Sequence, residues 1–160
     1  MDAKILVLGL GNLLLQDEGA GVRVIECLQA AYAFPDDVIV LDGGTLGLDL
    51  LAYIENTPRI IIVDAVKAGK EPGALVRRVN EEIPAFLGPK VSPHQVGLQD
   101  LLALAKLRGH FPDAVILWGV QAERLEPGLE LSPPVAAQLE TMARHIVEEL
   151  ERWNLRLEKR

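Results

Sequence analysis

The sequence contains almost no cysteine. Cys27 is the only one among 160 residues, so the chain can form no internal disulfide and can build no zinc or iron–sulfur site on cysteine ligands. Cys27 falls among apolar residues of a predicted helix, where we interpret it as a small core side chain and not as a catalytic thiol. A chain without disulfides fits a reducing compartment, and we therefore expect a cytoplasmic protein.

Long hydrophobic runs are also missing. No apolar stretch reaches the roughly 18–20 residues that a membrane-spanning helix requires. The apolar run that begins at Ile5 lacks a basic flank and a small-residue cleavage site, and it contains Gly9 and Gly11, so we expect no signal peptide. The sequence therefore predicts no membrane partner.

The chain has no excess of positive charge. It carries 16 Lys and Arg residues against 23 Asp and Glu residues, for a formal net charge of -7. A net acidic surface repels phosphates and disfavours non-specific binding to nucleic acid. No run of Lys or Arg overrides this average, so we expect no nucleic-acid partner.

Hydrophobic patterning is abundant. Hydrophobic residues make up 49% of the chain, and together with the length they predict one globular domain over residues 1–160. Continuous apolar runs predict strands, and apolar residues at helical spacing predict helices between them. The predicted strands cover residues 5–8, 38–41, 59–63, 75–79 and 114–118. The predicted helices cover residues 19–33, a segment capped by Thr45, residues 98–108, and a final segment capped by Ser132.

The alternation of strands and helices predicts an α/β fold, a three-layer α/β/α sandwich around a mostly parallel sheet. Arg77 and Arg78 lie within one predicted strand and indicate that it forms an edge of the sheet. The charged residues that end at Arg160 are expected to be frayed. Ligands bind such folds beyond the carboxyl ends of the strands, near the point where the strand order reverses. The residues that follow the first three strands are therefore the first candidates for a site.

The turn after the first strand resembles a dinucleotide-binding turn, but it fails as one. Gly9 and Gly11 match the fingerprint, whereas its third glycine is replaced by Leu14. The pair Asp17-Glu18 occupies the helix N-terminus, where two carboxylates would repel a pyrophosphate. A nucleotide-binding domain is therefore the weaker alternative, favoured only by the position of Asp42 after the second strand.

Two carboxylates and a histidine fall where a site is expected. Glu18 follows the first strand, Asp64 ends the third, and His94 precedes the helix at 98–108. Oxygen and nitrogen ligands of this kind suit a borderline divalent metal such as nickel or zinc, or general acid–base chemistry. Each residue has a structural alternative: Glu18 could favour a helix N-terminus, Asp64 could cap a turn, and His94 could be a packing or surface residue.

The segment Asp42-Gly43-Gly44-Thr45 also has two interpretations. Its glycines could let the backbone approach a bound peptide, or the segment could be a tight strand-to-helix turn with Thr45 as cap. For Asp42 itself a functional and a structural role are both open. The sequence holds no serine in a G-x-S-x-G setting and suggests no Cys–His pair, which disfavours covalent nucleophilic catalysis.

Motifs along most of the chain resemble the nickel–iron hydrogenase maturation endopeptidases. Each motif is weak alone, but together and in this order they are specific. The motifs are Gly9-Leu10-Gly11-Asn12, Asp17-Glu18-Gly19, Gly21-Val22-Arg23, Asp42-Gly43-Gly44-Thr45, Ile62-Val63-Asp64-Ala65-Val66, Ser92-Pro93-His94-Gln95-Val96-Gly97, Gly119-Val120-Gln121 and Leu131-Ser132-Pro133.

The resemblance implies a protease that removes a C-terminal extension from the hydrogenase large-subunit precursor after nickel insertion. It assigns the metal-contacting triad to Glu18, Asp64 and His94, and catalytic roles to Asp42 and Asp64. It also implies a five-stranded mixed sheet with one antiparallel strand, which agrees with residues 75–79 as the edge strand. Nickel would be carried by the substrate and held weakly or not at all by the free protein, for which a monomer is favoured. The alternative is a non-catalytic factor that handles nickel or binds the precursor.

Overall fold

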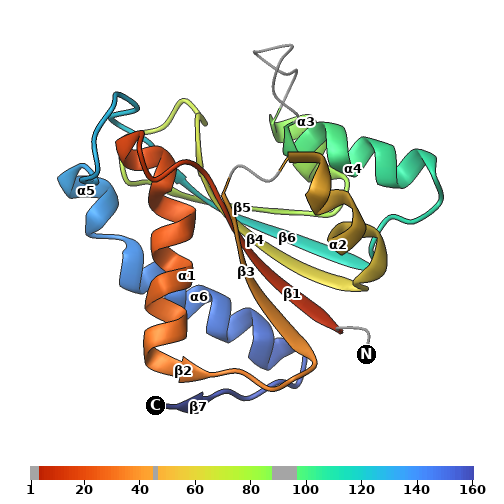
Figure 1. Cartoon of the computed structure of the whole chain (residues 1–160). Helices are drawn as coiled ribbons and strands as arrows, with labels where there is room; N and C mark the ends of the chain where they lie inside the picture. The colour runs from red at the N-terminus through yellow and green to blue at the C-terminus, as the bar shows by residue number, and fades with distance from the viewer. Residues whose placement is uncertain (1–3, 45–46, 88–96) are drawn as a thin grey trace.

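The computed structural model describes residues 4–44, 47–87 and 97–160. In these residues a central sheet lies between two groups of helices (Figure 1). The predicted cap Thr45 and the predicted ligand His94 lie outside the described residues. The predicted α/β/α sandwich is confirmed, and no helix of the described part is long and apolar enough to cross a membrane.

The central sheet has five strands in the order β3-β1-β4-β6-β5. They are β1 (Ile5–Leu10), β3 (Val38–Gly44), β4 (Arg59–Val66), β5 (Leu75–Val79) and β6 (Ala114–Gln121). Neighbouring strands pair in parallel, except β5 and β6, which are antiparallel. The prediction of one antiparallel strand at an edge is therefore confirmed in β5, the strand that contains Arg77 and Arg78.

Each face of the sheet buries its own hydrophobic core. Helices α1 (Ala20–Ala31) and α6 (Leu139–Arg152) cover one face, whereas α2 (Leu50–Asn56), α3 (Glu82–Leu87) and α4 (Leu98–Leu107) cover the other (Figure 1). Successive residues of β1 serve both cores, since Val7 packs toward α1 and α6 and Leu8 packs toward α2 and α4. Burial on both faces explains why the strands appear in the sequence as continuous apolar runs.

Helix α1 approaches the sheet closely at Gly21. A Cβ at this position would overlap the carbonyl oxygens of Val63 and Leu10. Gly21 thus provides the close helix–strand contact that a dinucleotide fingerprint assigns to its third glycine, here Leu14. The helix begins later than in a nucleotide-binding turn, because a short 3₁₀ helix, η1 (Gln16–Gly19), precedes it.

The C-terminal part of the chain differs from the prediction in two ways. The final helix is two helices, α5 (Pro133–Ala136) and α6, and the side chain of Ser132 forms no capping hydrogen bond because its hydroxyl donates to Asp17 instead. The end of the chain is paired and not frayed. Strand β7 (Glu158–Lys159) pairs antiparallel with β2 (Tyr32–Ala33), and the Arg160 Nε donates to the Tyr32 carbonyl at 2.9 Å.

Candidate active site

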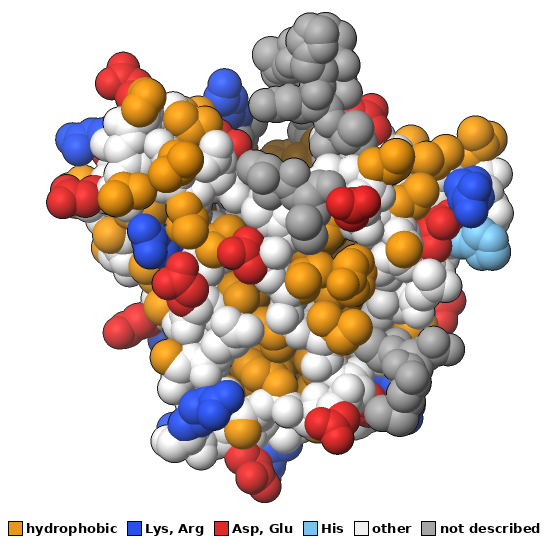
Figure 2. All heavy atoms as spheres, viewed as in Figure 1, with side chains coloured by type: hydrophobic (Ala, Val, Ile, Leu, Met, Phe, Trp, Pro, Cys, Tyr) orange, Lys and Arg blue, Asp and Glu red, His pale blue; other side chains and the backbone are white. Residues whose placement is uncertain are grey.

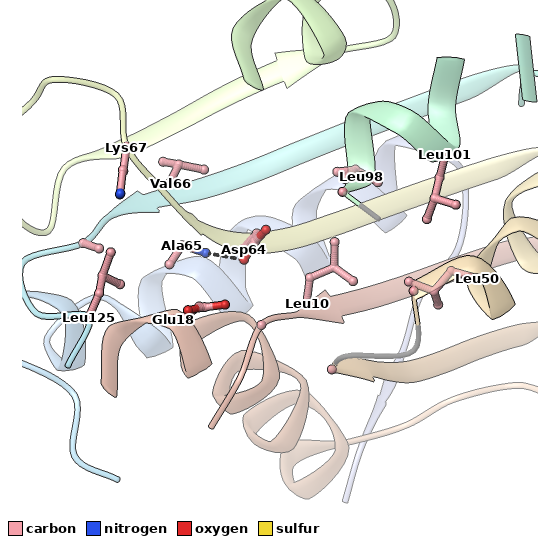
Figure 3. Close-up of a pocket in the computed structure, with 15 residues that line it drawn as sticks. Leu10, Glu18, Leu50, Asp64, Ala65, Val66, Lys67, Leu98, Leu101 and Leu125 are labelled. Carbon is pink, nitrogen blue, oxygen red and sulfur yellow. Dashed lines mark hydrogen bonds between the residues drawn. The ribbon is translucent and has the colours of Figure 1, made fainter. Parts of the chain in front are cut away.

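A cavity of about 560 Å³ opens at the carboxyl ends of β1 and β4. The strand order reverses here, because the chain passes from β1 to β3 on one side and from β3 to β4 on the other. This is the position at which open α/β sheets bind ligands. Figure 3 shows Glu18 and Asp64 between an apolar side formed by Leu50, Leu98 and Leu101 and a side formed by Lys67 and Leu125.

The first carboxylate, Glu18, enters the cavity from η1. The chain leaves β1 through Gly11, whose φ of +120° favours glycine, and a Cβ there would overlap the carbonyl oxygen of Glu18. Burial raises the pKa of the Glu18 carboxyl, and the positive charge of Lys67 partly opposes that rise. The side chain of Glu18 accepts no hydrogen bond from the described residues of the chain.

The second carboxylate, Asp64, lies on β4 just beyond the end of its pairing with β1. The last pair between these strands is Gly9 with Val63, whereas β4 continues beside β6 as far as Val66. The sequence predicted that the strand ends at Asp64, whereas β4 continues two residues further, to Val66, and only its pairing with β1 ends at Val63. Burial raises the pKa of Asp64 most, the Ala65 N–H that donates to its Oδ1 at 2.8 Å lowers it, and the charge of Glu18 raises it, so that the pKa is about 7.

The third predicted carboxylate, Asp42, lies apart from the other two. It is exposed on β3 at the edge of the sheet, with β1 between it and β4, and it does not line the cavity. Gly44, two residues further along, does line the cavity. The structure therefore brings Glu18 and Asp64 together and leaves Asp42 near the rim.

The predicted histidine ligand cannot be placed in this site. His94 lies outside the described residues, and within the described ranges no three His, Cys, Asp or Glu side chains cluster as a metal site. Gly97 and Leu98, which follow the segment that contains His94, line the cavity. The two other histidines belong elsewhere: His145 stacks on Trp118 with the rings 4.3 Å apart, and His110 is exposed after α4.

Two site features were not predicted from the sequence. Lys67 lines the cavity and acts on Glu18, but a single lysine after a strand carries no recognisable motif. Asp17, which the sequence paired with Glu18, points away from the cavity and is fully buried. Burial raises the pKa of Asp17, but hydrogen bonds from the backbone N–H groups of Arg124, Ser132 and Glu123 and from the Ser132 hydroxyl lower it more.

The cavity suits a ligand that combines a cation with apolar groups. Two nearby carboxylates with raised pKa values gain stability when a divalent cation neutralises them. A carboxylate that titrates near pH 7 can also accept a proton during catalysis. The leucines provide a wall for apolar parts of a ligand. Figure 2 shows acidic and basic side chains scattered over the viewed face of the molecule.

Known proteins are similar to this chain in both sequence and fold. The chain is 46% identical over 138 residues to "Hydrogenase 2 maturation protease" of Escherichia coli (strain K12), which covers 86% of this chain and 84% of that protein. It is 43% identical over 158 residues to the hydrogenase expression/formation protein HupD of Rhodobacter capsulatus, with 98% of this chain and 75% of that protein covered.

Solved structures agree with these relatives. The hydrogenase maturating endopeptidase HybD from E. coli has a TM-score of 0.92 at 41% identity and covers 98% of both chains. A [NiFe] hydrogenase maturation protease HycI from Thermococcus kodakarensis KOD1 has a TM-score of 0.74 at 25% identity, with 94% of both chains covered. The family model described as "Hydrogenase maturation protease" matches residues 22–149. The chain therefore belongs to the hydrogenase maturation protease family and is a hydrolase, an endopeptidase.

Proposed function

We propose that this endopeptidase removes the C-terminal extension of a nickel–iron hydrogenase large-subunit precursor and recognises the nickel that the precursor already carries. The observation that supports this most strongly is the meeting of Glu18 and Asp64 in one cavity at the switch point of the sheet. Two carboxylates held together in a partly buried site attract a cation, and a metal-loaded precursor would supply it.

Nickel is part of the substrate in this proposal. Glu18 and Asp64 offer two oxygen ligands, and His94 is the predicted third ligand. Three protein ligands or fewer leave positions for the groups of the precursor that already hold the ion. The free protein is therefore expected to bind nickel weakly, and the complex forms when substrate and protease share the ion.

The bound ion would promote cleavage by positioning the precursor. An ion held by the Glu18 and Asp64 carboxylates would fix the adjacent chain of the precursor in the cavity, so that the scissile bond stays near the catalytic groups. Asp64 is also a predicted catalytic group, since a carboxylate in the cavity beside the scissile bond can take a proton from water. Asp42 remains a second predicted catalytic group, and its exposed position near the rim suits contact with the bound precursor.

We also propose that the protein acts in the cytoplasm as a monomer. A precursor that is processed after metal insertion would be met in the cytoplasm, and a monomer leaves the cavity open to it. Light scattering of the purified protein tests the second point, with a stable dimer as the contradicting result.

The experiment that tests the proposed activity separates a protease from a precursor-binding factor. Purified protein is incubated with nickel-loaded precursor, and intact mass is recorded over time. We expect loss of the C-terminal peptide with the unsubstituted protein and none with Asp64→Asn. A stable complex without any loss of mass would contradict the proposal and would favour the binding factor.

A further inference from the structure

The most extensively bonded buried carboxylate near the cavity is one that does not face it. Asp17 Oδ2 accepts hydrogen bonds from the backbone N–H groups of Glu123 and Arg124 and from the Ser132 hydroxyl, each at 2.8 Å. Its Oδ1 accepts the Ser132 N–H at 2.7 Å. These donors lie 106 to 115 positions further along the chain, in the segment between β6 and α5. One buried side chain therefore ties η1 to this segment.

The two elements that Asp17 joins are walls of the same cavity. On one side, η1 presents Glu18, the residue directly after Asp17. On the other, the segment between β6 and α5 presents Ala122 and Leu125, which also line the cavity (Figure 3). The backbone adds further ties, since the Asp17 N–H donates to the Arg124 carbonyl and the Gln16 N–H donates to the Gly128 carbonyl, each at 3.0 Å.

The carboxylate of Glu18 depends on the backbone of η1 for its position. Its side chain accepts no hydrogen bond from the described residues, so its position depends on the backbone of η1. That element is a single 3₁₀ turn of four residues, its N-cap residue Leu15 makes no side-chain capping bond, and Gln16 has a positive φ of 49°. Short turns of this kind are weak by themselves. The side-chain bonds of Asp17 therefore act together with the backbone bonds of Gln16 and Glu18 in fixing where Glu18 points.

We propose that Asp17 is a positioning residue, which holds Glu18 and the wall that contains Leu125 at the spacing required by the nickel-loaded precursor. The inference rests on the proposed function. In this proposal Asp17 does not contact the substrate. Only a carboxylate can accept all four of these hydrogen bonds, because the NH₂ group of an amide at this position would face another donor in either orientation.

The test compares Asp17→Asn with Ser132→Ala and with Glu149→Gln. Ser132→Ala removes one of the four side-chain bonds and keeps the Ser132 N–H. Glu149 is the matched control: its side chain is 1% exposed and accepts bonds from Arg77, Trp118 and Arg152, but it does not line the cavity. The measurements are kcat and KM for the nickel-loaded precursor, at a temperature at which circular dichroism shows each variant folded.

We expect Asp17→Asn to lower kcat/KM at least tenfold, Ser132→Ala to lower it less, and Glu149→Gln to leave it unchanged even where it lowers Tm as much. Unchanged kcat/KM in folded Asp17→Asn, or an equal loss in Glu149→Gln, would overturn the proposal. If Asp17→Asn does not fold, Ser132→Ala decides: a loss beyond that of Glu149→Gln supports the proposal, and unchanged kinetics overturn it.

A failure of the proposed function is distinguished by the unsubstituted protein. If it cleaves no loaded precursor, the proposed function fails, and Asp17 is then tested by calorimetric titration with Ni²⁺ alone. Weaker Ni²⁺ binding in Asp17→Asn than in Glu149→Gln, with faster hydrogen exchange at Glu123, Arg124 and Ser132, would still support positioning. Equal Ni²⁺ binding in the two variants would overturn it.

Discussion

The charge of Glu18 raises the pKa of Asp64, which burial alone already raises strongly, so that Asp64 titrates near pH 7. The two residues come from separate elements, η1 and β4, and meet only in the folded chain. Ionisation of Asp64 next to Glu18 in the buried cavity is therefore unfavourable at neutral pH. The same pair becomes favourable when a cation lies between them.

Asp64 is therefore expected to lower the stability of the free protein as the pH rises. Its pKa in the folded state, about 7, lies above the ordinary value of 3.8, so the unfolded chain loses its proton first. The contribution of Asp64 to the free energy of unfolding falls between about pH 4 and pH 7 and is level above that range. Asp64→Asn should raise the free energy of unfolding by roughly 1–3 kcal/mol at pH 8 and by little below pH 4.

Urea unfolding at pH 4, 6 and 8 checks this expectation. Asp42→Asn serves as the control, because the Asp42 side chain is exposed and its replacement should change the urea midpoint little at any of the three pH values. An Asp64→Asn protein that is less stable than the unsubstituted one at pH 8 would contradict the argument.

The position of Asp64 in the site could be predicted from the sequence, because a carboxylate after four apolar β-forming residues lies near the carboxyl end of a strand, and the strand-end rule needs only the order of elements. Glu18 was found in the same way. Asp17 was not, since nothing near it in the sequence shows that its partners lie at Glu123, Arg124 and Ser132. Asp17 and Glu18 are adjacent and chemically alike in the sequence, although Asp17 is fully buried and Glu18 lines the cavity.

The predicted triad should be essential for processing. Glu18→Gln, Asp64→Asn and His94→Ala are each expected to lower kcat/KM for the nickel-loaded precursor by about 10²-fold or more, because each removes a ligand of the shared ion. Initial rates of C-terminal peptide release, measured by mass spectrometry, provide the values. His110→Ala, which replaces an exposed histidine outside the cavity, is the control and should remain fully active. A fully active Glu18→Gln protein would show that Glu18 is not a ligand of the ion.

Glu149 should stabilise the fold in neutral solution and lose that effect in acid. Burial raises the pKa of its carboxyl, but hydrogen bonds from Arg77 and Trp118 and the charge of Arg77 lower it more, so the pKa lies below the ordinary value of 4.5. The stabilisation is present above that value and disappears as the pH falls through the lower pKa of the folded state.

Glu149→Gln is therefore expected to lower the free energy of unfolding by about 1–3 kcal/mol at pH 7 and by less at pH 3. Thermal unfolding at the two pH values measures the difference. Glu148→Gln, on the same helix but half exposed, should have a much smaller effect at both. An equal loss at pH 3 and pH 7 would show that the charge of Glu149 is not the source of the stabilisation.

Close contact between α1 and the sheet should make Gly21 intolerant of any side chain. Gly21→Ala would place a methyl group against the carbonyl oxygens of Val63 and Leu10, both backbone atoms that cannot turn aside. We expect a loss of about 2–4 kcal/mol in the free energy of unfolding, measured by urea denaturation. Gln29→Ala, on the exposed side of the same helix, is the control and should cost little. A Gly21→Ala protein of ordinary stability would contradict the observed packing.

In the C-terminal part of the chain, local sequence patterns do not predict two of the contacts that form. A serine followed by two prolines is a good helix start, and the helix does begin there, but the hydroxyl of Ser132 bonds to Asp17 from across the fold. The charged tail suggested fraying, whereas β7 pairs with β2, which is only two residues long. In both cases a contact distant in sequence decides the structure, and neither local propensity nor periodicity records such a contact.

The central claim is that the cavity recognises nickel in the substrate. The most direct test is the ratio of initial cleavage rates for nickel-loaded and nickel-free precursor, measured by intact mass with the same purified protein. The account predicts that the loaded form is cleaved at least about a hundredfold faster, because only the ion fixes the scissile bond in the cavity. Equal cleavage of the two forms would contradict it.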